Sequence, residues 1–234
     1  MTDDPVDRAM KAFREGRFVY VYDADGREEE VDFFLPAQTT TGAHVRQMRQ
    51  DGGGLIFLMV GNGIASKIGL PFMADILMEA AAKYEVLQAF VPDDIPYDTK
   101  SSFSVTINHR NTFTGITDND RALTIAEFGK LADVAAPMST EEALELYGRN
   151  FRAPGHVPIC VASERPLKTR FGHTELSVAL LMMAGLTPVS VGCEMMADDG
   201  GSLSREDAMA YAEERGAPFL DGRQIIERWS EWSG

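Results

Sequence analysis

Apolar positions along the chain recur in two patterns, which alternate from one end of the sequence to the other. Spacings of three and four residues, bounded by Thr, Ser or Gly, are typical of amphipathic helices, whereas short apolar or alternating runs are typical of strands. The first pattern predicts helices over 4–15, 41–50, 122–134, 174–184, 204–216 and 223–232. The second pattern predicts strands over 18–22, 31–35, 55–60, 102–108, 157–162 and 188–193.

These elements interleave without a strict βαβ repeat. We therefore predict an α+β fold with a mixed β-sheet and surrounding helices, rather than a doubly wound parallel sheet. No Ser/Gly linker, low-complexity tract or internal repeat divides the sequence, and 234 residues fit one large domain. We expect residues 1–234 to form a single domain.

Composition excludes several classes of function. The apolar run 178–186 is too short to span a bilayer, and residues 1–8 carry acids where a signal peptide carries bases, so we expect a cytoplasmic protein without membrane contact. Two cysteines, Cys160 and Cys193, predict neither a disulfide framework nor a structural zinc site. A net charge of -14 argues against nucleic-acid binding. A phosphorylated substrate remains possible, because salt screens exposed charges beyond roughly 8 Å.

The segment 23–32 holds six carboxylates and one arginine. A solvated hairpin loop is the simplest interpretation, and an EF-hand is excluded because Arg27 and Glu28 stand where that loop needs Asp or Asn and then Gly. If residues 28–32 are extended, however, Glu28, Glu30 and Asp32 share one face. Carboxylates clustered at a strand end suit Mg²⁺ or Mn²⁺ better than zinc.

The four histidines are His44, His109, His156 and His173. We interpret His44 as a surface helix residue and His109 as a structural residue at a strand end. The other two are predicted to lie in glycine-flanked turns, 152–157 and 170–175.

The second of these turns has the features of a phosphate site. Free N–H groups and the dipole at the start of the helix 174–184 favour an anion, and Arg170 could reach the same anion with two donors. Arg170, Gly172 and Thr174 thus form a predicted phosphate cradle. His173 would stand between the phosphate and the rest of the substrate, in a position suited to a neutral metal ligand.

At these motifs the sequence resembles the 3,4-dihydroxy-2-butanone 4-phosphate synthases, the lyases of riboflavin biosynthesis, over nearly its whole length. The motifs that carry the resemblance are Arg27-Glu28-x-Glu30-x-Asp32, Thr114-Gly115-Ile116-Thr117 with Asp120-Arg121, Arg152-x-Pro154-Gly155-His156, Gly172-His173-Thr174-Glu175 and Cys193-Glu194-Met195-Met196 followed by Asp198-Asp199-Gly200. The run from Asp94-Ile95-Pro96-Tyr97-Asp98 to Asn108-His109-Arg110 is similar to the archaeal-type branch. Because the chain ends at Gly234, the resemblance predicts a monofunctional enzyme without a cyclohydrolase domain.

The resemblance implies roles for individual residues. It implies that Glu28 and His173 hold a divalent metal, Mg²⁺ or Mn²⁺, and that His156, Glu194 and Asp32 take part in catalysis. The substrate contacts that it implies come from Arg27, Glu28, Asp32, Arg170, Phe171, Gly172, His173, Thr174 and Glu194. It also implies a homodimer with active sites at the subunit interface, so that His156 acts across it.

The implied reaction converts D-ribulose 5-phosphate into L-3,4-dihydroxybutan-2-one 4-phosphate plus formate through a metal-stabilised enediolate. Several acid–base steps in one pocket account for a cluster of carboxylates, and either Asp32 or Glu194 could be the enolising base. Two alternatives are another Mg-dependent sugar-phosphate isomerase or aldolase, and a non-catalytic protein that kept the fold. The second alternative predicts the loss of a key residue, yet Glu28, His156, His173 and Glu194 are all present.

Overall fold

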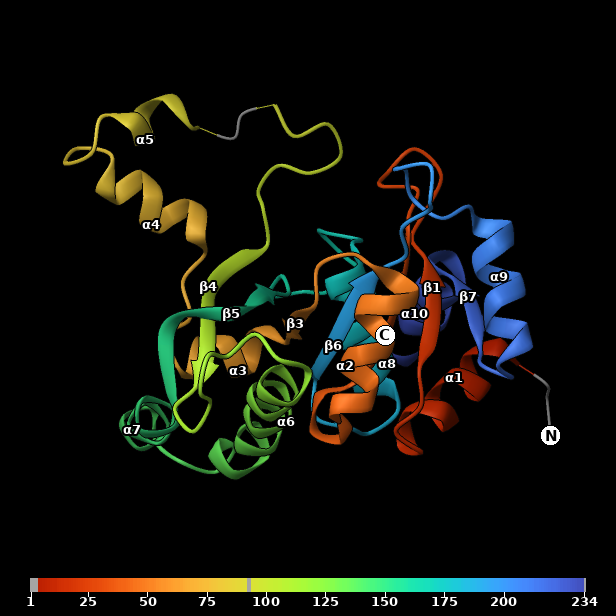
Figure 1. The fold of residues 1–234 in the computed structure, drawn as a ribbon, viewed down its shortest axis with the longest axis horizontal. Coiled ribbons are helices and arrows are strands. Elements are labelled where there is room, and N and C mark those ends of the chain that lie inside the picture. Colours follow the sequence, from red (N-terminus) through yellow and green to blue (C-terminus); the bar gives the residue numbers. More distant parts are fainter. Residues whose placement is uncertain (1–3, 92–93, 234) are drawn as a thin grey trace.

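The strands form one mixed sheet in the order β4-β5-β3-β6-β2-β1-β7 (Figure 1). The computed structural model describes residues 4–91 and 94–233. The strands are β1 Val19–Tyr22, β2 Val31–Pro36, β3 Phe57–Val60, β4 Phe103–His109, β5 Phe151–Val161, β6 Val189–Glu194 and β7 Phe219–Asp221. Pairs β1–β7 and β3–β5 are parallel and the other neighbours are antiparallel, which confirms the predicted mixed α+β sheet.

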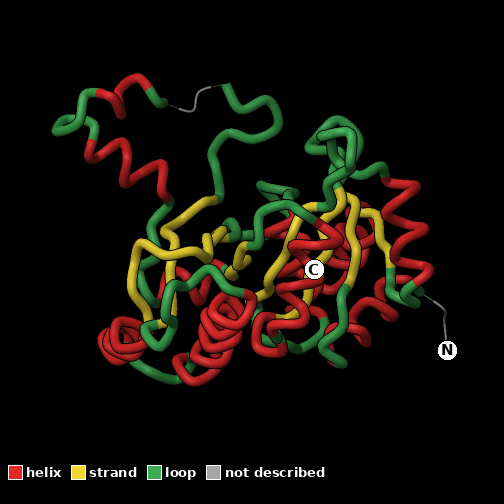
Figure 2. The backbone as a smooth tube through the Cα atoms, viewed as in Figure 1, coloured by secondary structure: helices red, strands yellow, loops and turns green. Residues whose placement is uncertain are grey.

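Helices cover both faces of this sheet (Figure 2). They are α1 Pro5–Arg14, α2 Gly42–Gln47, α3 Asn62–Lys67, α4 Met73–Ala80, α5 Val86–Ala89, α6 Asp118–Ala135, α7 Thr140–Asn150, α8 His173–Met183, α9 Arg205–Glu214 and α10 Gly222–Trp232. All six predicted helices are present within a few residues of their expected ends. Helix α2 is shorter than predicted, because a π-helical turn takes the place of its last residues over Met48–Gly52.

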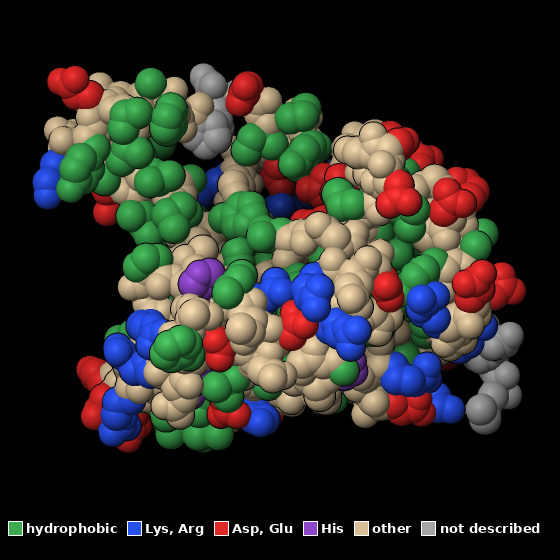
Figure 3. All heavy atoms as spheres, in the orientation of Figure 1, with side chains coloured by type: hydrophobic (Ala, Val, Ile, Leu, Met, Phe, Trp, Pro, Cys, Tyr) green, Lys and Arg blue, Asp and Glu red, His purple; other side chains and the backbone are tan. Residues whose placement is uncertain are grey.

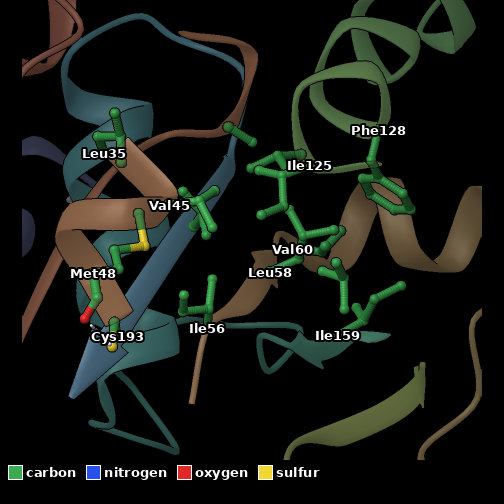
Figure 4. Packing of buried hydrophobic residues seen from close by; sticks show 14 of the residues in the cluster. Leu35, Val45, Met48, Ile56, Leu58, Val60, Ile125, Phe128, Ile159 and Cys193 are labelled. Atoms are coloured by element: carbon green, nitrogen blue, oxygen red, sulfur yellow. Dashed lines mark hydrogen bonds between the residues drawn. The ribbon is translucent and has the colours of Figure 1, made fainter. Parts of the chain in front are cut away.

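Two apolar layers, one on each face of the sheet, form the core. One layer joins the sheet to α2, α6, α7 and α9, and Figure 4 shows part of it, with Val45 and Ile125 facing Leu58 and Val60. The other layer joins the sheet to α1, α8 and α10. Strand β1 supplies both, Tyr20 to the first and Val21 to the second, so its four residues are buried on both faces.

Strand β5 corrects one sequence prediction. We expected a turn over 152–157 and a strand only from residue 157, but β5 is continuous from Phe151 to Val161. It pairs with β4 through an irregular register that shifts between Ile107 and Asn108. Gly155 and Pro154 are accommodated at this irregularity, where an added Cβ on Gly155 would lie 2.0 Å from the Ile107 carbonyl carbon.

Helices α4 and α5 lie in an arm, residues 73–90, that extends away from the body (Figure 1). No residue of either helix is buried, and hydrophobic side chains gather on this part of the surface (Figure 3). Met78 and Phe90 are each 67% exposed. In the described part of the chain, no helix combines the length and hydropathy needed to cross a membrane.

Candidate active site

A cavity of 440 Å³ opens where β2 begins, β6 ends and α8 starts. Its lining residues are Arg27, Glu28, Glu30, Asp32, Phe57, Pro96, Tyr97, Ser102, Phe103, Cys160, Arg170, His173, Thr174 and Glu194. Most of the side chains predicted for the site are therefore brought together in one place. Gly172 has no side chain to line the cavity. It allows the backbone to approach Arg27 closely, because a Cβ there would lie 2.7 Å from Arg27 Nη2.

Sheet register brings two of the carboxylates together. Asp32 in β2 is paired directly with Glu194 in the antiparallel strand β6. Directly opposite residues of an antiparallel pair project from the same face, so both carboxylates point toward the cavity. The N–H of Leu55 donates to Glu194 Oε2 at 2.7 Å, which fixes that carboxylate.

The loop between β1 and β2 is organised by Asp23 rather than by an extended chain. Its buried carboxylate accepts hydrogen bonds from the N–H groups of Glu28 at 3.1 Å and Glu30 at 3.2 Å. Glu29 has φ 58°, and strand β2 begins only at Val31, so residues 28–32 are not all extended and the condition for the alternation is not met. Glu28 and Glu30 still line the same cavity as Asp32, because this turn directs them there, whereas the strand pairing of β2 directs Asp32.

His173, the first residue of α8, lies at the centre of the carboxylates. It is 5% exposed, and its Nδ1 lies 3.2 Å from Glu28 Oε2 and 3.6 Å from Asp32 Oδ1. Its Nε2 lies 3.2 Å from the carbonyl oxygen of Val21, so we assign the Nε2 proton to that hydrogen bond. Nδ1 is thus directed at the carboxylates.

Burial and charge shift the pKa values of these groups in different directions. Burial lowers the pKa of His173, but Asp32, Glu28 and Asp23 outweigh it and raise the pKa to about 9. Burial raises the pKa of Glu28, yet His173 and Arg27 bring it down to about 2. For Asp32, burial raises the pKa well above its ordinary value despite His173, and Glu194 and Glu28 raise it further. Burial also raises the pKa of Glu194.

These residues fit a divalent cation. Asp32 Oδ1 is buried and has no hydrogen-bond partner in the part of the chain that the structure describes. The proton that His173 Nδ1 shares with Glu28 occupies a place that a cation could take. The Nε2–H bond to Val21 is the kind of support that orients a histidine ligand. Within residues 4–91 and 94–233, however, no three His, Cys, Asp or Glu side chains form a ready-made metal site. The expected ligand set has only two protein members, Glu28 and His173.

Replacing Asp32 with asparagine should stabilise the protein at neutral pH. Because folding raises the pKa of Asp32, its contribution to stability is complete below its unfolded pKa of about 3.9 and is lost as pH rises through the folded value. Asparagine cannot ionise, so the advantage of Asp32→Asn should grow above about pH 4. We expect a gain of about 1 kcal/mol, or roughly 2–4 °C in Tm, at pH 7.5.

Thermal unfolding of both proteins between pH 4 and pH 8 measures this difference. Asp94→Asn, which removes an exposed carboxylate, provides the matched control. A lower Tm for Asp32→Asn at pH 7.5 would contradict the assignment of Asp32 as a buried, poorly compensated acid.

The two arginines of the cavity are already paired with carboxylates. Arg170 Nη1 donates to Glu175 Oε2 at 2.6 Å, and Arg170 Nε donates to Asp98. Arg27 Nη1 lies 3.1 Å from Asp23 and 3.0 Å from Glu28, while its Nη2 lies 3.6 Å from Asp98. The phosphate cradle that we predicted around Arg170 thus holds a protein carboxylate in this structure.

Glu175 and His156, two residues of the family motifs, make contacts that the sequence did not indicate. Glu175 accepts hydrogen bonds from the Arg170 guanidinium and, at 2.9 Å, from the Ser163 N–H, so it links three segments. Its carboxylate also places a negative charge at the start of α8. His156 is not among the residues that line the cavity. It is an exposed residue of β5, and its Nδ1 lies 3.1 Å from Asn108 Nδ2 in β4.

Sequence reasoning missed Tyr97, which lines the cavity, and Asp98 and Asp23, which pair with its two arginines. Tyr97 and Asp98 belong to a run that we noted only for its resemblance to the archaeal branch, and Asp23 was counted as one more acid. Nothing in the local pattern indicates that Asp98 reaches Arg170, because the two residues are far apart in the sequence. Asp198-Asp199-Gly200 forms a turn, as its composition predicts, with Asp199 accepting the Gly201 N–H at 2.9 Å.

Comparison with known proteins gives one consistent answer. The profile of the 3,4-dihydroxy-2-butanone 4-phosphate synthases matches residues 7–228. The synthase of Methanothermobacter thermautotrophicus is 49% identical over 228 residues, with 97% of this chain and 96% of that protein covered. The synthase of Archaeoglobus fulgidus is 46% identical, with 97% and 94% covered.

Solved structures show the same fold. A synthase of Candida albicans superimposes with a TM-score of 0.70 at 26% identity, covering 96% of each chain. A synthase described in complex with two magnesium ions gives a TM-score of 0.74 at 24% identity, covering 99% of each chain. The profile match and the archaeal relatives show that this chain belongs to the 3,4-dihydroxy-2-butanone 4-phosphate synthase family.

Proposed function

We propose that the carboxylate cavity is where this chain carries out the reaction of its family, a step of riboflavin biosynthesis. That reaction converts D-ribulose 5-phosphate into L-3,4-dihydroxybutan-2-one 4-phosphate plus formate. The observation that carries the proposal is the convergence of Glu28, Asp32, His173 and Glu194 in one cavity that also holds Arg27 and Arg170. Carboxylates and a histidine serve proton transfer, and the arginines match the phosphate end of the substrate.

Glu28 and His173 are the proposed ligands of the divalent cation. Magnesium is our first choice, because a relative with the same fold is described with two magnesium ions and hard carboxylate oxygens suit this ion. When bound, the cation supplies a Lewis acid that polarises the carbonyl group of the substrate. Manganese has similar ligand preferences and is the alternative.

Asp32 and Glu194 are proposed to divide the proton transfers at the substrate. One oxygen of Asp32 has no hydrogen-bond partner among residues 4–91 and 94–233, and it can accept the C3 proton of the sugar phosphate. Glu194 has a raised pKa and is held by Leu55, which suits an acid that donates a proton when the C1 hydroxyl leaves. Both assignments place the proton on a carboxylate whose burial favours the neutral form.

We further propose that the enzyme is a homodimer and that His156 serves the cavity of a second copy. Within one chain, His156 is exposed and does not line the cavity. The arm of residues 73–90 presents Met78, Tyr84 and Phe90 to solvent, and contact with a second copy would bury this apolar surface.

Cys160 and Cys193 are free and buried, in keeping with the reducing cytoplasm.

Formate production tests the proposed function. Purified protein with D-ribulose 5-phosphate and magnesium should release one formate per substrate consumed, and excess chelator should stop the release. An isomerase or aldolase acting on the same sugar phosphate would consume substrate without formate. Glu194→Gln provides a control of the same size without the acid, and substrate loss without formate would refute the proposal.

A further inference from the structure

The cavity has a wall that belongs to neither a helix nor a strand. Residues 94–102 connect the arm to β4, and Pro96, Tyr97 and Ser102 of this segment line the cavity. The Tyr97 ring lies 5.4 Å from the Arg27 guanidinium, in a cation–π contact. Asp98, the next residue, accepts a hydrogen bond from Arg170 and lies 3.6 Å from Arg27. One short segment therefore covers both arginines.

Asp98 is held less firmly than two other carboxylates around these arginines, Asp23 and Glu175. Asp23 and Glu175 have fully buried side chains and accept backbone N–H groups from Glu28 and Ser163 respectively. Within residues 4–91 and 94–233, the one backbone N–H that Asp98 accepts is that of its neighbour Thr99, at 2.9 Å. Asp98 can therefore leave the arginines without breaking a helix, a strand or the loop after β1.

The contact between Asp98 and the arginines is also incomplete. Arg27 Nη2 is buried and has no hydrogen-bond partner among the described residues, since Asp98 lies 3.6 Å away. A phosphate group has more acceptor oxygens and a larger charge than one carboxylate, so it can satisfy Arg27 and Arg170 together. Exchanging one anion for another also avoids leaving two buried guanidinium groups unpaired.

We propose that Asp98 is an intramolecular competitor for the substrate phosphate and thereby determines specificity for a dianionic ligand. In the ligand-free protein its carboxylate lies between Arg27 and Arg170, and a phosphate dianion displaces it together with Tyr97. A neutral sugar cannot compete for the arginines and leaves the segment in place. This inference rests on the proposed function only in taking the phosphate end of the substrate to bind at Arg170.

Binding of inorganic phosphate to the full chain tests the competition without turnover. If Asp98 is paired with the arginines in most molecules, the apparent phosphate affinity is the intrinsic affinity multiplied by the small fraction of molecules in which Asp98 is displaced. Removing the competing carboxylate restores the intrinsic affinity. We expect Asp98→Asn to bind phosphate roughly tenfold more tightly in calorimetric titration. Asp94→Asn removes an exposed charge from the same segment and should change affinity less than about twofold.

Two further variants keep the result interpretable. Arg170→Ala should abolish phosphate binding in both the wild-type and the Asp98→Asn background, which locates the probe at this site. In Tyr97→Trp, phosphate should change the fluorescence of the new indole as the indole leaves Arg27. Buffer of equal ionic strength without phosphate or sulfate should not change it.

The outcomes separate this inference from the proposed function. Unchanged or weaker phosphate binding by Asp98→Asn would overturn the competition, because the carboxylate would then be neutral to the site or would position the arginines. The absence of phosphate binding in every variant would overturn it as well. If phosphate binds as expected but the wild-type protein releases no formate, the proposed function fails and the competition stands.

Discussion

Glu28→Gln is expected to abolish formate release, with a fall in turnover of at least about a thousandfold. Glutamine has the size of glutamate but no charge, and the low pKa of about 2 shows that Glu28 is ionised at every physiological pH. The variant therefore removes the negative charge that lies 3.2 Å from His173 Nδ1 and 3.0 Å from Arg27. Cation binding should weaken in parallel, because one of two proposed protein ligands is lost.

Turnover and cation affinity should be measured together, with formate release over a range of magnesium concentrations and calorimetric titration of magnesium. Glu29→Gln is the matched control, because Glu29 is exposed and its contact with the Gly26 N–H at 2.8 Å uses an oxygen that glutamine retains. Near-normal turnover of Glu28→Gln at limiting magnesium would show that Glu28 is not a ligand.

The sequence was sufficient for strands β1 to β6 and for most helices, because their signals are local. It did not predict the short strand β7, Phe219–Asp221. The helix predicted from 41, the strand predicted from 188 and the helix predicted from 174 each begin within one residue of the predicted start. Helix α7 has an equally local signal that we did not use, a capping box from Ser139 to Glu142. Strand β5 was shortened in prediction because Pro154 and Gly155 are usual in turns, and only pairing with β4 keeps them extended.

The site was predictable only in part, for a different physical reason. Clusters of residues close in sequence, such as 27–32 and 172–175, could be identified as candidate site residues. The family resemblance then indicated that the two clusters belong to one site. The conformation that aims Glu28 depends on Asp23 accepting two N–H groups, and the pairing of Arg170 depends on Asp98, 72 positions earlier in the chain. Such contacts follow from the folded chain and have no periodicity in the sequence.

His156→Ala should also remove nearly all activity, although His156 lies outside the cavity of its own chain. The reason that we propose is that two cavities each receive His156 from the opposite copy. Glu28→Gln and His156→Ala homodimers would then both be inactive, because every cavity lacks one group. In a heterodimer of the two variants, one cavity carries both substitutions and the other carries neither.

That heterodimer should therefore regain about half of the wild-type activity, since one of its two symmetric sites is intact. Co-expression of the variants with two different affinity tags, followed by purification on both, isolates the species to be assayed for formate. A heterodimer formed from His156→Ala and wild-type chains should likewise retain about half, and serves as the control for tagging. If His156 acts within its own chain, each cavity of the mixed dimer carries one substitution, and the preparation stays as inactive as its parents. Failure to isolate any doubly tagged dimer would contradict the proposed homodimer. The exposed arm of residues 73–90 and the position of His156 outside the cavity would then need another explanation.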